Sequence, residues 1–193
     1  MDSEARAAAV EYLRRKGTEA PVSKLIAGLR SAAQRFEQTI EGVPEELRSR
    51  RPSAAAWSVH EIVDHLVESN RPAVAELRQL CQGTSPGGGP IPAHLTSPDA
   101  RQRPWPDLVA ELKRINAELI AIVAAASDTT PLEARAASVI VVKVPGEPKP
   151  AVLEWVERLD WKAYTQALRI HMHEHTAQVE RTVSAVSQPE ETT

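Results

Sequence analysis

Residues 171–178, His-Met-His-Glu-His-Thr-Ala-Gln, hold three of the six histidines in this chain of 193 residues. They lie inside a longer stretch in which apolar side chains, histidine and threonine recur at steps of three and four residues. That spacing is typical of an amphipathic helix whose stripe faces a protein core. The stripe consists of Tyr164, Leu168, His171, His175, Val179, Thr182 and Val186. Two histidines therefore occupy positions where a helix of a bundle normally carries Leu or Ile.

His171 and His175 are one helical turn apart, about 40° around the axis, so both rings can reach one point. His173 is turned by about 200° from His171 and is expected to be exposed. Neutral imidazole is the commonest protein ligand for zinc, nickel, copper and iron. The pair therefore indicates either a metal site or two core histidines that a carboxylate or a buried water satisfies. A metal site would need a third ligand from another part of the chain.

The composition is that of one globular domain rich in helix. Hydrophobic residues make up 42% and charged residues 25% of the chain, and aromatic residues are scarce, so Ala and Leu supply most of the apolar content. The net charge of −3 and the lack of a basic block argue against nucleic acid as a partner. No stretch approaches the roughly 20 apolar residues of a membrane span. With Cys81 as the single cysteine, we expect a cytoplasmic protein without membrane contact or an intrachain disulfide.

Four segments with apolar residues at helical spacing predict an all-α protein built as a four-helix bundle. They are residues 22–41, 58–81, 107–126 and about 151–186, the last with a break near Asp160. Ser58 and Glu61 form the S-x-x-E pattern of a capping box at the start of the second segment. Pro72 should kink that helix or restart it.

The charged residues 3–16 predict an additional N-terminal helix on the outside of the bundle, with Gly17 as its C-terminal stop. The whole chain, residues 1–193, is expected to form a single domain. The accessory helix would occupy residues 1–20, the bundle residues 21–186, and a flexible tail residues 187–193.

Two segments do not fit the helical pattern. Residues 83–106 are rich in proline and glycine and predict a long loop, of the kind that acts as a lid or is mobile. His94 in this loop is expected at the surface. Residues 137–144, Ala-Ser-Val-Ile-Val-Val-Lys-Val, form one β-like run, which indicates either a short strand or an extended connection. A lone strand is not stable, and the sequence identifies no partner for it.

Residues 57–66, Trp-Ser-Val-His-Glu-Ile-Val-Asp-His-Leu, carry a W-[ST]-x-x-E-x-x-x-H-L pattern well before the H-x-x-x-H-x-x-Q pattern of residues 171–178. In this order, on a helical chain, the two patterns resemble those of the DinB/YfiT-like superfamily of metalloenzymes. The resemblance spans about residues 22–186 and implies a four-helix bundle. Members often carry H-E-x-H-H-x-x-Q, whereas this chain arranges Glu174 and the extra His173 differently. That departure bears on the substrate class more than on metal binding.

By position, the resemblance implies that His65 is the first metal ligand and that His171 and His175 complete a three-histidine site with open coordination positions. Periodicity alone places His65 at the flank of the apolar arc of its helix, about 60° from Ile62. The resemblance favours zinc or nickel as the metal, and some members also use a low-molecular-weight thiol. Gln178, one turn after His175, is either an outer hydrogen-bond partner of that ring or an ordinary amide at the edge of the core.

Other polar residues near the two motifs are expected to have simpler roles. Solvated charge on a helix face is the expected role of the nearby carboxylates, although each could instead orient a histidine ring. These carboxylates are Glu61, Asp64, Glu68 and Glu174. Trp57 is expected to anchor the start of its helix by packing, and His60 is expected to be exposed. Nothing in the sequence places Cys81 on the histidine face.

Three functional hypotheses follow. The first is a divalent-metal-dependent enzyme, either a thiol-dependent S-transferase or a hydrolase, that acts on a small molecule. The second is a metal-containing bundle with a binding or stress-response role and no catalysis. The third is a purely structural helical domain whose core histidines are hydrogen-bonded. Family members often dimerise through bundle faces, and the alanine-rich helix at residues 117–126 would serve as the face of a homodimer.

Overall fold

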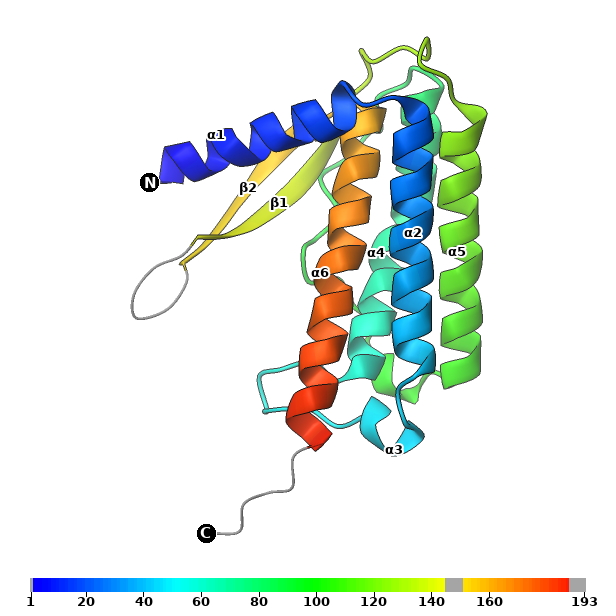
Figure 1. Cartoon of the computed structure of the whole chain (residues 1–193), viewed down its shortest axis with the longest axis vertical. Helices are drawn as coiled ribbons and strands as arrows, with labels where there is room; N and C mark the ends of the chain where they lie inside the picture. The colour runs from blue at the N-terminus through cyan, green and yellow to red at the C-terminus, as the bar shows by residue number, and fades with distance from the viewer. Residues whose placement is uncertain (1, 145–150, 188–193) are drawn as a thin grey trace.

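Four long helices pack side by side in the computed structural model, which describes residues 2–144 and 151–187 (Figure 1). They are α2 (Val22–Glu41), α4 (Val59–Cys81), α5 (Trp105–Ala125) and α6 (Trp161–Ser187). Helices α2 and α4 each contact both α5 and α6, so the predicted four-helix bundle is present. Two short helical pieces, α3 (Glu45–Arg48) and η2 (Ala100–Gln102), lie in the connections.

The apolar stripes of the four helices meet in one core. Burying a large aliphatic or aromatic side chain contributes about 1.5–3 kcal/mol relative to leaving it exposed. The fully buried members include Leu29, Phe36, Ile40, Leu66, Leu112, Leu119 and Val179. The spacing of these residues in the sequence is therefore sufficient to define the four faces that meet.

The N-terminus of α4 is fixed by the predicted capping box. The Ser58 Oγ accepts a hydrogen bond from the backbone N–H of Glu61 (3.3 Å), and the Glu61 carboxylate accepts one from the backbone N–H of Ser58 (2.9 Å). Arg51 adds an ion pair to that carboxylate. This guanidinium, together with the Ser58 donors, lowers the pKa of Glu61 to about 2. Glu61 is only 6% exposed, so the prediction of a solvated charge at this position was wrong.

Pro72 does not end α4, which runs as one helix from Val59 to Cys81. The prediction of a restart was therefore wrong. The buried residues on both sides of Pro72 explain the continuity, because the packing of Ala73 and Leu77 holds the second half of the helix against the bundle.

Helix α1 (Asp2–Leu13) is followed by a π-helical turn, η1 (Arg14–Thr18), that packs on α6. Gly17 does not stop the helix but allows a close approach. A Cβ atom at this position would lie 2.6 Å from the Cα of Ala163. The glycine thus lets the chain cross α6 at backbone contact, and α1 extends sideways from the end of the bundle (Figure 1).

A β-hairpin corrects the all-α prediction. Strand β1 (Ala136–Val144) pairs antiparallel with β2 (Ala151–Leu159), with Ala136 opposite Leu159. The predicted β-like run is therefore a strand, and its partner lies where the sequence predicted the beginning of the fourth helix. Residues 151–159, Ala-Val-Leu-Glu-Trp-Val-Glu-Arg-Leu, contain the β-branched and aromatic side chains that a pleated surface accommodates well.

Helix α6 begins only after the hairpin. The Asp160 carboxylate accepts hydrogen bonds from the backbone N–H groups of Lys162 (3.0 Å) and Ala163 (2.9 Å), as an N-terminal cap does. The break expected near Asp160 is therefore the true start of the helix. Ser187 ends it, and residues 188–193 of the predicted tail lie outside the described residues. Within the described part of the chain, no helix has the length and apolar character needed to cross a membrane.

Removal of the Glu61 carboxylate tests the capping box. We expect Glu61→Ala to lower the free energy of unfolding by about 1–2 kcal/mol, because both a cap hydrogen bond and a charge partner of Arg51 are lost. Glu61→Gln keeps the cap geometry and should lose less. Since the folded pKa is about 2, the charge-dependent part should be present above about pH 4.5 and disappear as the pH falls toward 2. Urea denaturation across this range measures both effects, and equal midpoints for wild type and Glu61→Ala would contradict the assignment.

Candidate metal centre

Three histidine rings from two helices converge on one point. His65 comes from α4, and His171 and His175 come from α6. The Nε2 atom of His171 lies 3.0 Å from that of His65 and 2.9 Å from that of His175. One ligand atom from each residue lies within 4.8 Å of the other two, as a common metal ion requires. The structure thus brings together the three residues that the sequence proposed as ligands.

The packing of a loop explains why His65 is buried although periodicity put it at the flank of its helix. His65 is 1% exposed, and its Nδ1 donates a hydrogen bond to the backbone carbonyl of Leu95 (2.7 Å). The indole of Trp57 lies against it, with ring centroids 5.0 Å apart. The loop therefore gives α4 a second buried side, which helical periodicity cannot reveal.

The hydrogen bonds fix the tautomers of two rings. A carbonyl oxygen can only accept, so the proton of neutral His65 is on Nδ1 and its Nε2 carries a lone pair. His175 donates from Nδ1 to the Oε1 of Gln178 (2.8 Å), so its Nε2 also carries a lone pair. His171 can donate only one proton from Nε2, to one of these two atoms. With neutral rings, hydrogen bonds within the cluster cannot satisfy all three nitrogens.

Protonation does not resolve this conflict, because burial disfavours the charged form of all three rings. Burial lowers the pKa of His175 to about 4, with the neighbouring His65 contributing in the same direction. The pKa of His65 is also lowered by burial, and that of His171 lies well below its ordinary value, through burial and then its two histidine neighbours. All three rings are therefore neutral near pH 7, which is the form that binds a metal.

A divalent cation fits this donor set. Nitrogen ligands about 2.0–2.1 Å from a tetrahedral zinc lie roughly 3.3 Å apart, close to the Nε2 separations of 2.9 and 3.0 Å. Three neutral imidazoles would leave at least one further coordination position open. Nickel, which also favours imidazole, is an alternative occupant. The lone pairs that hydrogen bonding leaves unmatched would all be used by such an ion.

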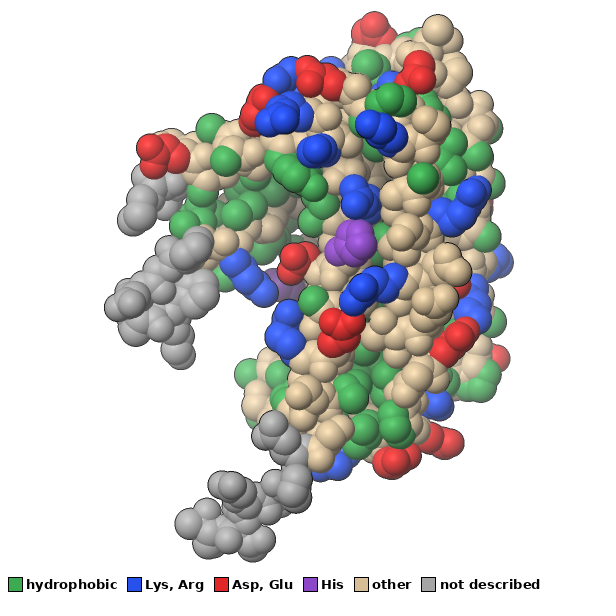
Figure 2. Space-filling model, viewed as in Figure 1, with side chains coloured by type: hydrophobic (Ala, Val, Ile, Leu, Met, Phe, Trp, Pro, Cys, Tyr) green, Lys and Arg blue, Asp and Glu red, His purple; other side chains and the backbone are tan. Residues whose placement is uncertain are grey.

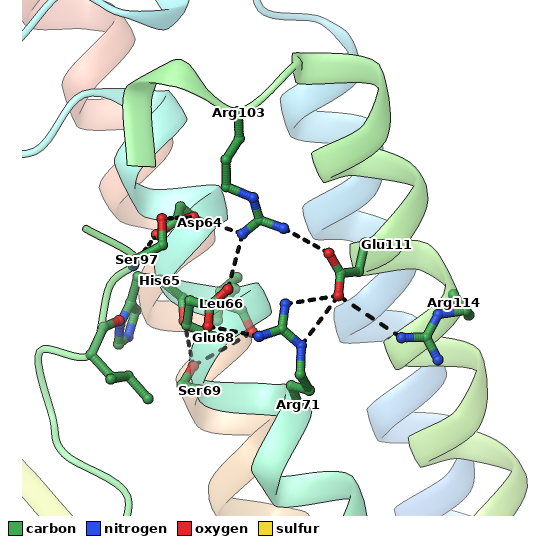
Figure 3. Close-up of polar contacts among 11 residues, drawn as sticks. Asp64, His65, Leu66, Glu68, Ser69, Arg71, Ser97, Arg103, Glu111 and Arg114 are labelled. Atoms are coloured by element: carbon green, nitrogen blue, oxygen red, sulfur yellow. Dashed lines mark hydrogen bonds and ion pairs between the residues drawn. The ribbon is translucent and has the colours of Figure 1, made fainter. Parts of the chain in front are cut away.

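An ionic network fastens the loop that carries Leu95 to α4 (Figure 3). The Asp64 carboxylate, next to His65 in the chain, accepts hydrogen bonds from the backbone N–H (2.7 Å) and the hydroxyl (2.9 Å) of Ser97. Arg103 joins Asp64 (2.8 Å) to Glu111 of α5 (2.6 Å). The network thereby holds the Leu95 carbonyl where it orients the His65 ring.

Several expectations about neighbouring residues need correction. Asp64 was expected to be solvated and is fully buried, because Ser97 and Arg103 cover it. His60 was expected to be exposed but is 5% exposed, with its ring edge against Trp105. The sequence gave no signal for Ser97 or Arg103, since loop residues follow no period. Both lie in the long loop, far from the motifs.

The remaining expectations have mixed outcomes. His173 and His94 are exposed, as expected, and Glu174 is exposed on α6. The expectation of a solvated charge at Glu68 was wrong, because its side chain is partly buried and pairs with Arg71 and Arg103. The position of Gln178, 2.8 Å from the His175 ring, matches the outer hydrogen-bond role rather than that of an unconnected amide.

A cavity of about 1310 Å³ opens above the three rings. Its floor is formed by α4 and α6, and its other walls by α1, β1 and the segments around Trp57 and His94. Figure 2 shows hydrophobic side chains gathered below α1 beside the hollow that separates the hairpin from the bundle. Cys81 is not among the residues that line the cavity, and burial raises the pKa of its thiol to about 11. This thiol is therefore not placed or ionised to act at the candidate centre.

The family model described as the DinB superfamily matches residues 29–158, which is more than half of the chain. The chain belongs to the DinB superfamily. The matched residues include His65 but end before His171 and His175. The assignment of these two histidines to the centre therefore rests on the geometry and on the H-x-x-x-H-x-x-Q pattern. No curated protein matches this DinB sequence at a significant level.

Solved structures share the fold of this DinB protein. YfiT from Bacillus subtilis, described as a probable metal-dependent hydrolase with an unusual four-helix bundle topology, matches with a TM-score of 0.63 and 13% identity over 87% of this chain and 89% of its own. An uncharacterised protein from Escherichia coli UTI89 matches with a TM-score of 0.57 and 14% identity over 88% of this chain and 96% of its own. At these identities the likeness establishes the fold and not the activity.

The ionic network of Figure 3 predicts that a substitution outside the three histidines changes metal affinity. We expect Arg103→Ala to weaken zinc binding about tenfold, because the loop loses its tie to Asp64 and Glu111 and the Leu95 carbonyl no longer orients His65. Competition with a chromogenic chelator measures the affinity, and circular dichroism checks that the variant is folded.

Arg114→Ala is the matched control. Arg114 belongs to the same ionic cluster but pairs with Glu111 and Glu118 on its own helix and does not reach the loop. Its zinc affinity should equal that of wild type. An Arg103→Ala protein that is folded and binds zinc as tightly as Arg114→Ala would show that the network does not position the histidine.

Proposed function

We propose that this DinB protein is a divalent-metal-dependent enzyme in which His65, His171 and His175 hold the metal at the floor of the cavity. The observation that carries the proposal is the convergence of the Nε2 atoms of three neutral imidazoles, which hydrogen bonds within the cluster cannot all satisfy at once. Purely structural histidines would be matched with donors or carboxylates instead. Zinc and nickel are the ions that this all-nitrogen donor set favours.

A divalent ion at this position supplies Lewis acidity toward a water, a thiol or a carbonyl oxygen. The residues of the chain orient the three histidine rings. The Leu95 carbonyl and the Gln178 amide keep the protons of His65 and His175 on Nδ1, so that both Nε2 atoms face the cavity floor. Trp57 stacks on the His175 ring, at 6.4 Å between centroids, and limits the rotation of both side chains.

Hydrolysis is the reaction that we favour. No cysteine lies among the described residues that line the cavity, so a water is the nucleophile that needs no further group from the chain. Glu174 lines the cavity beside the histidines and could accept the proton that such a water gives up. The description of YfiT as a probable metal-dependent hydrolase supports the same reaction class for a protein of this fold.

Transfer to a thiol is the second candidate, and the size of the cavity is the observation in its favour. Ligand sites usually have volumes of about 300–1000 Å³, whereas this cavity has about 1310 Å³. It has room for a low-molecular-weight thiol next to an electrophile. The thiol sulfur would form a bond to carbon as the leaving group departs from that carbon, and the thiol proton would pass to a base.

Metal content tests the proposal directly. We expect the purified protein, incubated with zinc or nickel, to carry about one metal ion per chain by mass spectrometry. His65→Ala, His171→Ala and His175→Ala should each lose most of it, because two nitrogens bind the ion far less tightly than three. His173→Ala, on the exposed side of the same helix, is the control and should keep it.

Turnover separates an enzyme from a metal-binding bundle. Hydrolysis of ester and amide panels, and consumption of a thiol with electrophiles, should disappear with a chelator, return with metal and be absent in His171→Ala. A wild-type protein that remains metal-free after incubation with both ions would overturn the proposal. Stoichiometric metal without turnover on either panel would instead support the binding role.

A further inference from the structure

A second pocket, of about 350 Å³, lies at the junction of η1, α2 and α6. Four cationic side chains line it: Arg15, Lys16, Lys24 and Arg169. Among the described residues that line it, Glu19 supplies the only carboxylate. Figure 2 shows Lys and Arg side chains gathered over this junction. The pocket is therefore strongly basic, although the chain as a whole carries a net charge of −3.

Carboxylates of the protein do not neutralise these four cations. None of the four takes part in an ion pair among the described residues. Glu19 is paired with Arg14 instead, and so is the nearby Glu11. Like charges that share a small pocket repel one another. The arrangement is therefore unfavourable by itself and becomes favourable when an anion enters.

Arg169 is the least exposed of the four cations, and a glycine provides the space for its side chain. A Cβ atom at Gly28 of α2 would lie 3.0 Å from the Cδ and 3.1 Å from the Nε of Arg169. The one hydrogen bond that its guanidinium makes to a described residue is long, from Nη1 to the Oε1 of Gln166 (3.4 Å). A partly buried guanidinium without a carboxylate partner indicates an anion that comes from outside the chain.

The two cations of η1 are held in place by the backbone of that π-helical turn. Such turns are rare, and they occur frequently at functional sites. Gly17 brings η1 into backbone contact with α6. The hydroxyl of Thr18 donates to the Asp160 carboxylate at the start of α6 (2.7 Å). Because Arg15 and Lys16 directly precede these contacts, their backbone is fixed beside α6.

Lys24 completes the pocket from α2. It precedes Gly28 by one helical turn, so the two positions lie on the same side of α2, with Cβ positions about 5–6 Å apart. The side chain of Arg169 lies over Gly28. The Lys24 amine can therefore reach an anion that this guanidinium binds, and η1, α2 and α6 each supply a cation to one place.

We propose that this pocket binds the phosphate groups of a small molecule that carries at least two negative charges, such as a diphosphate. Guanidinium groups donate paired N–H groups to phosphate oxygens, and lysines add compact positive charge. The excess of cations over carboxylates in the lining is better balanced by a multivalent anion than by a single carboxylate. The pocket volume is at the lower end of the range of ligand sites, which suits a compact anionic group.

The pocket is separate from the candidate metal centre. None of the residues that line the pocket also lines the cavity above the histidines. Arg169 precedes His171 by two residues, about 200° around α6, so the two sites lie on opposite sides of that helix. The inference therefore does not depend on metal binding, and it adds a second ligand site to the proposed function.

Titration calorimetry with pyrophosphate, at about 0.15 M ionic strength, tests the proposal. Arg169→Gln and Lys24→Gln should each weaken binding about tenfold, because each removes a charge-assisted contact. Arg50→Gln is the matched control and should bind as wild type does. Arg50 is exposed and follows α3, at the opposite end of the bundle from η1 (Figure 1), so this variant loses the same charge away from the pocket.

Gly28→Leu tests the geometry without a change of charge. The leucine side chain would occupy the space on α2 where the Arg169 side chain lies. Pyrophosphate binding should weaken about as much as in Arg169→Gln. Circular dichroism checks the fold of each variant, and the exposed Lys24 provides the comparison if a substitution at Gly28 or Arg169 prevents folding.

His171→Ala separates the pocket from the metal centre, since a bound metal ion also attracts pyrophosphate. This variant should bind pyrophosphate as tightly as wild type. The inference is overturned if wild type does not bind pyrophosphate, or if neither Arg169→Gln nor Lys24→Gln weakens binding. Equal weakening in Arg50→Gln would show a response to total charge alone. Loss of binding in His171→Ala would assign the anion to the metal centre, and either result also rejects the pocket.

Discussion

The convergence of ring nitrogens from three neutral histidines inside a helical bundle is the constraint on which the local structure depends. In a low-dielectric core such nitrogens need a proton or a cation between them, and burial disfavours the extra proton. The rings must also be held against rotation if they are to share one ion. The Leu95 carbonyl holds the His65 ring and the Gln178 amide holds the His175 ring, each by accepting a hydrogen bond from Nδ1.

This requirement extends into parts of the chain far from the rings. The Leu95 carbonyl can orient His65 only if its loop stays in place. Asp64 and Arg103 attach the loop to α4, and Glu111 connects the same network to α5. A buried carboxylate with a charge partner and two Ser97 donors is satisfied, so the attachment does not leave an isolated charge in the core.

The sequence predicted the features that follow from periodicity and local motifs. It missed those that depend on contacts with segments far away in the chain. The sequence predicted three of the four bundle helices and the capping box at Ser58, because each of these features is set by residues within one or two helical turns of one another. Residues 151–159 were mistaken for helix, since the pairing with β1 that holds them extended cannot be seen from their own spacing. His60 and Asp64 were expected at the surface because a helix by itself does not show that a loop lies over its flank.

The same loop changes the interpretation of the cavity. Its proline and glycine content suggested a lid or a mobile segment, yet its central part is tied to α4 by a side-chain carboxylate and a ring nitrogen. A wall held in this way cannot open without breaking the orientation of His65, so substrate entry that passes through it would disturb the centre. The opposite wall, made of α1 and β1, has no such tie to the histidines. Tyr12 and Val141 of that wall line the cavity and remain 45% and 46% exposed, so this side of the cavity is the more open one to solvent.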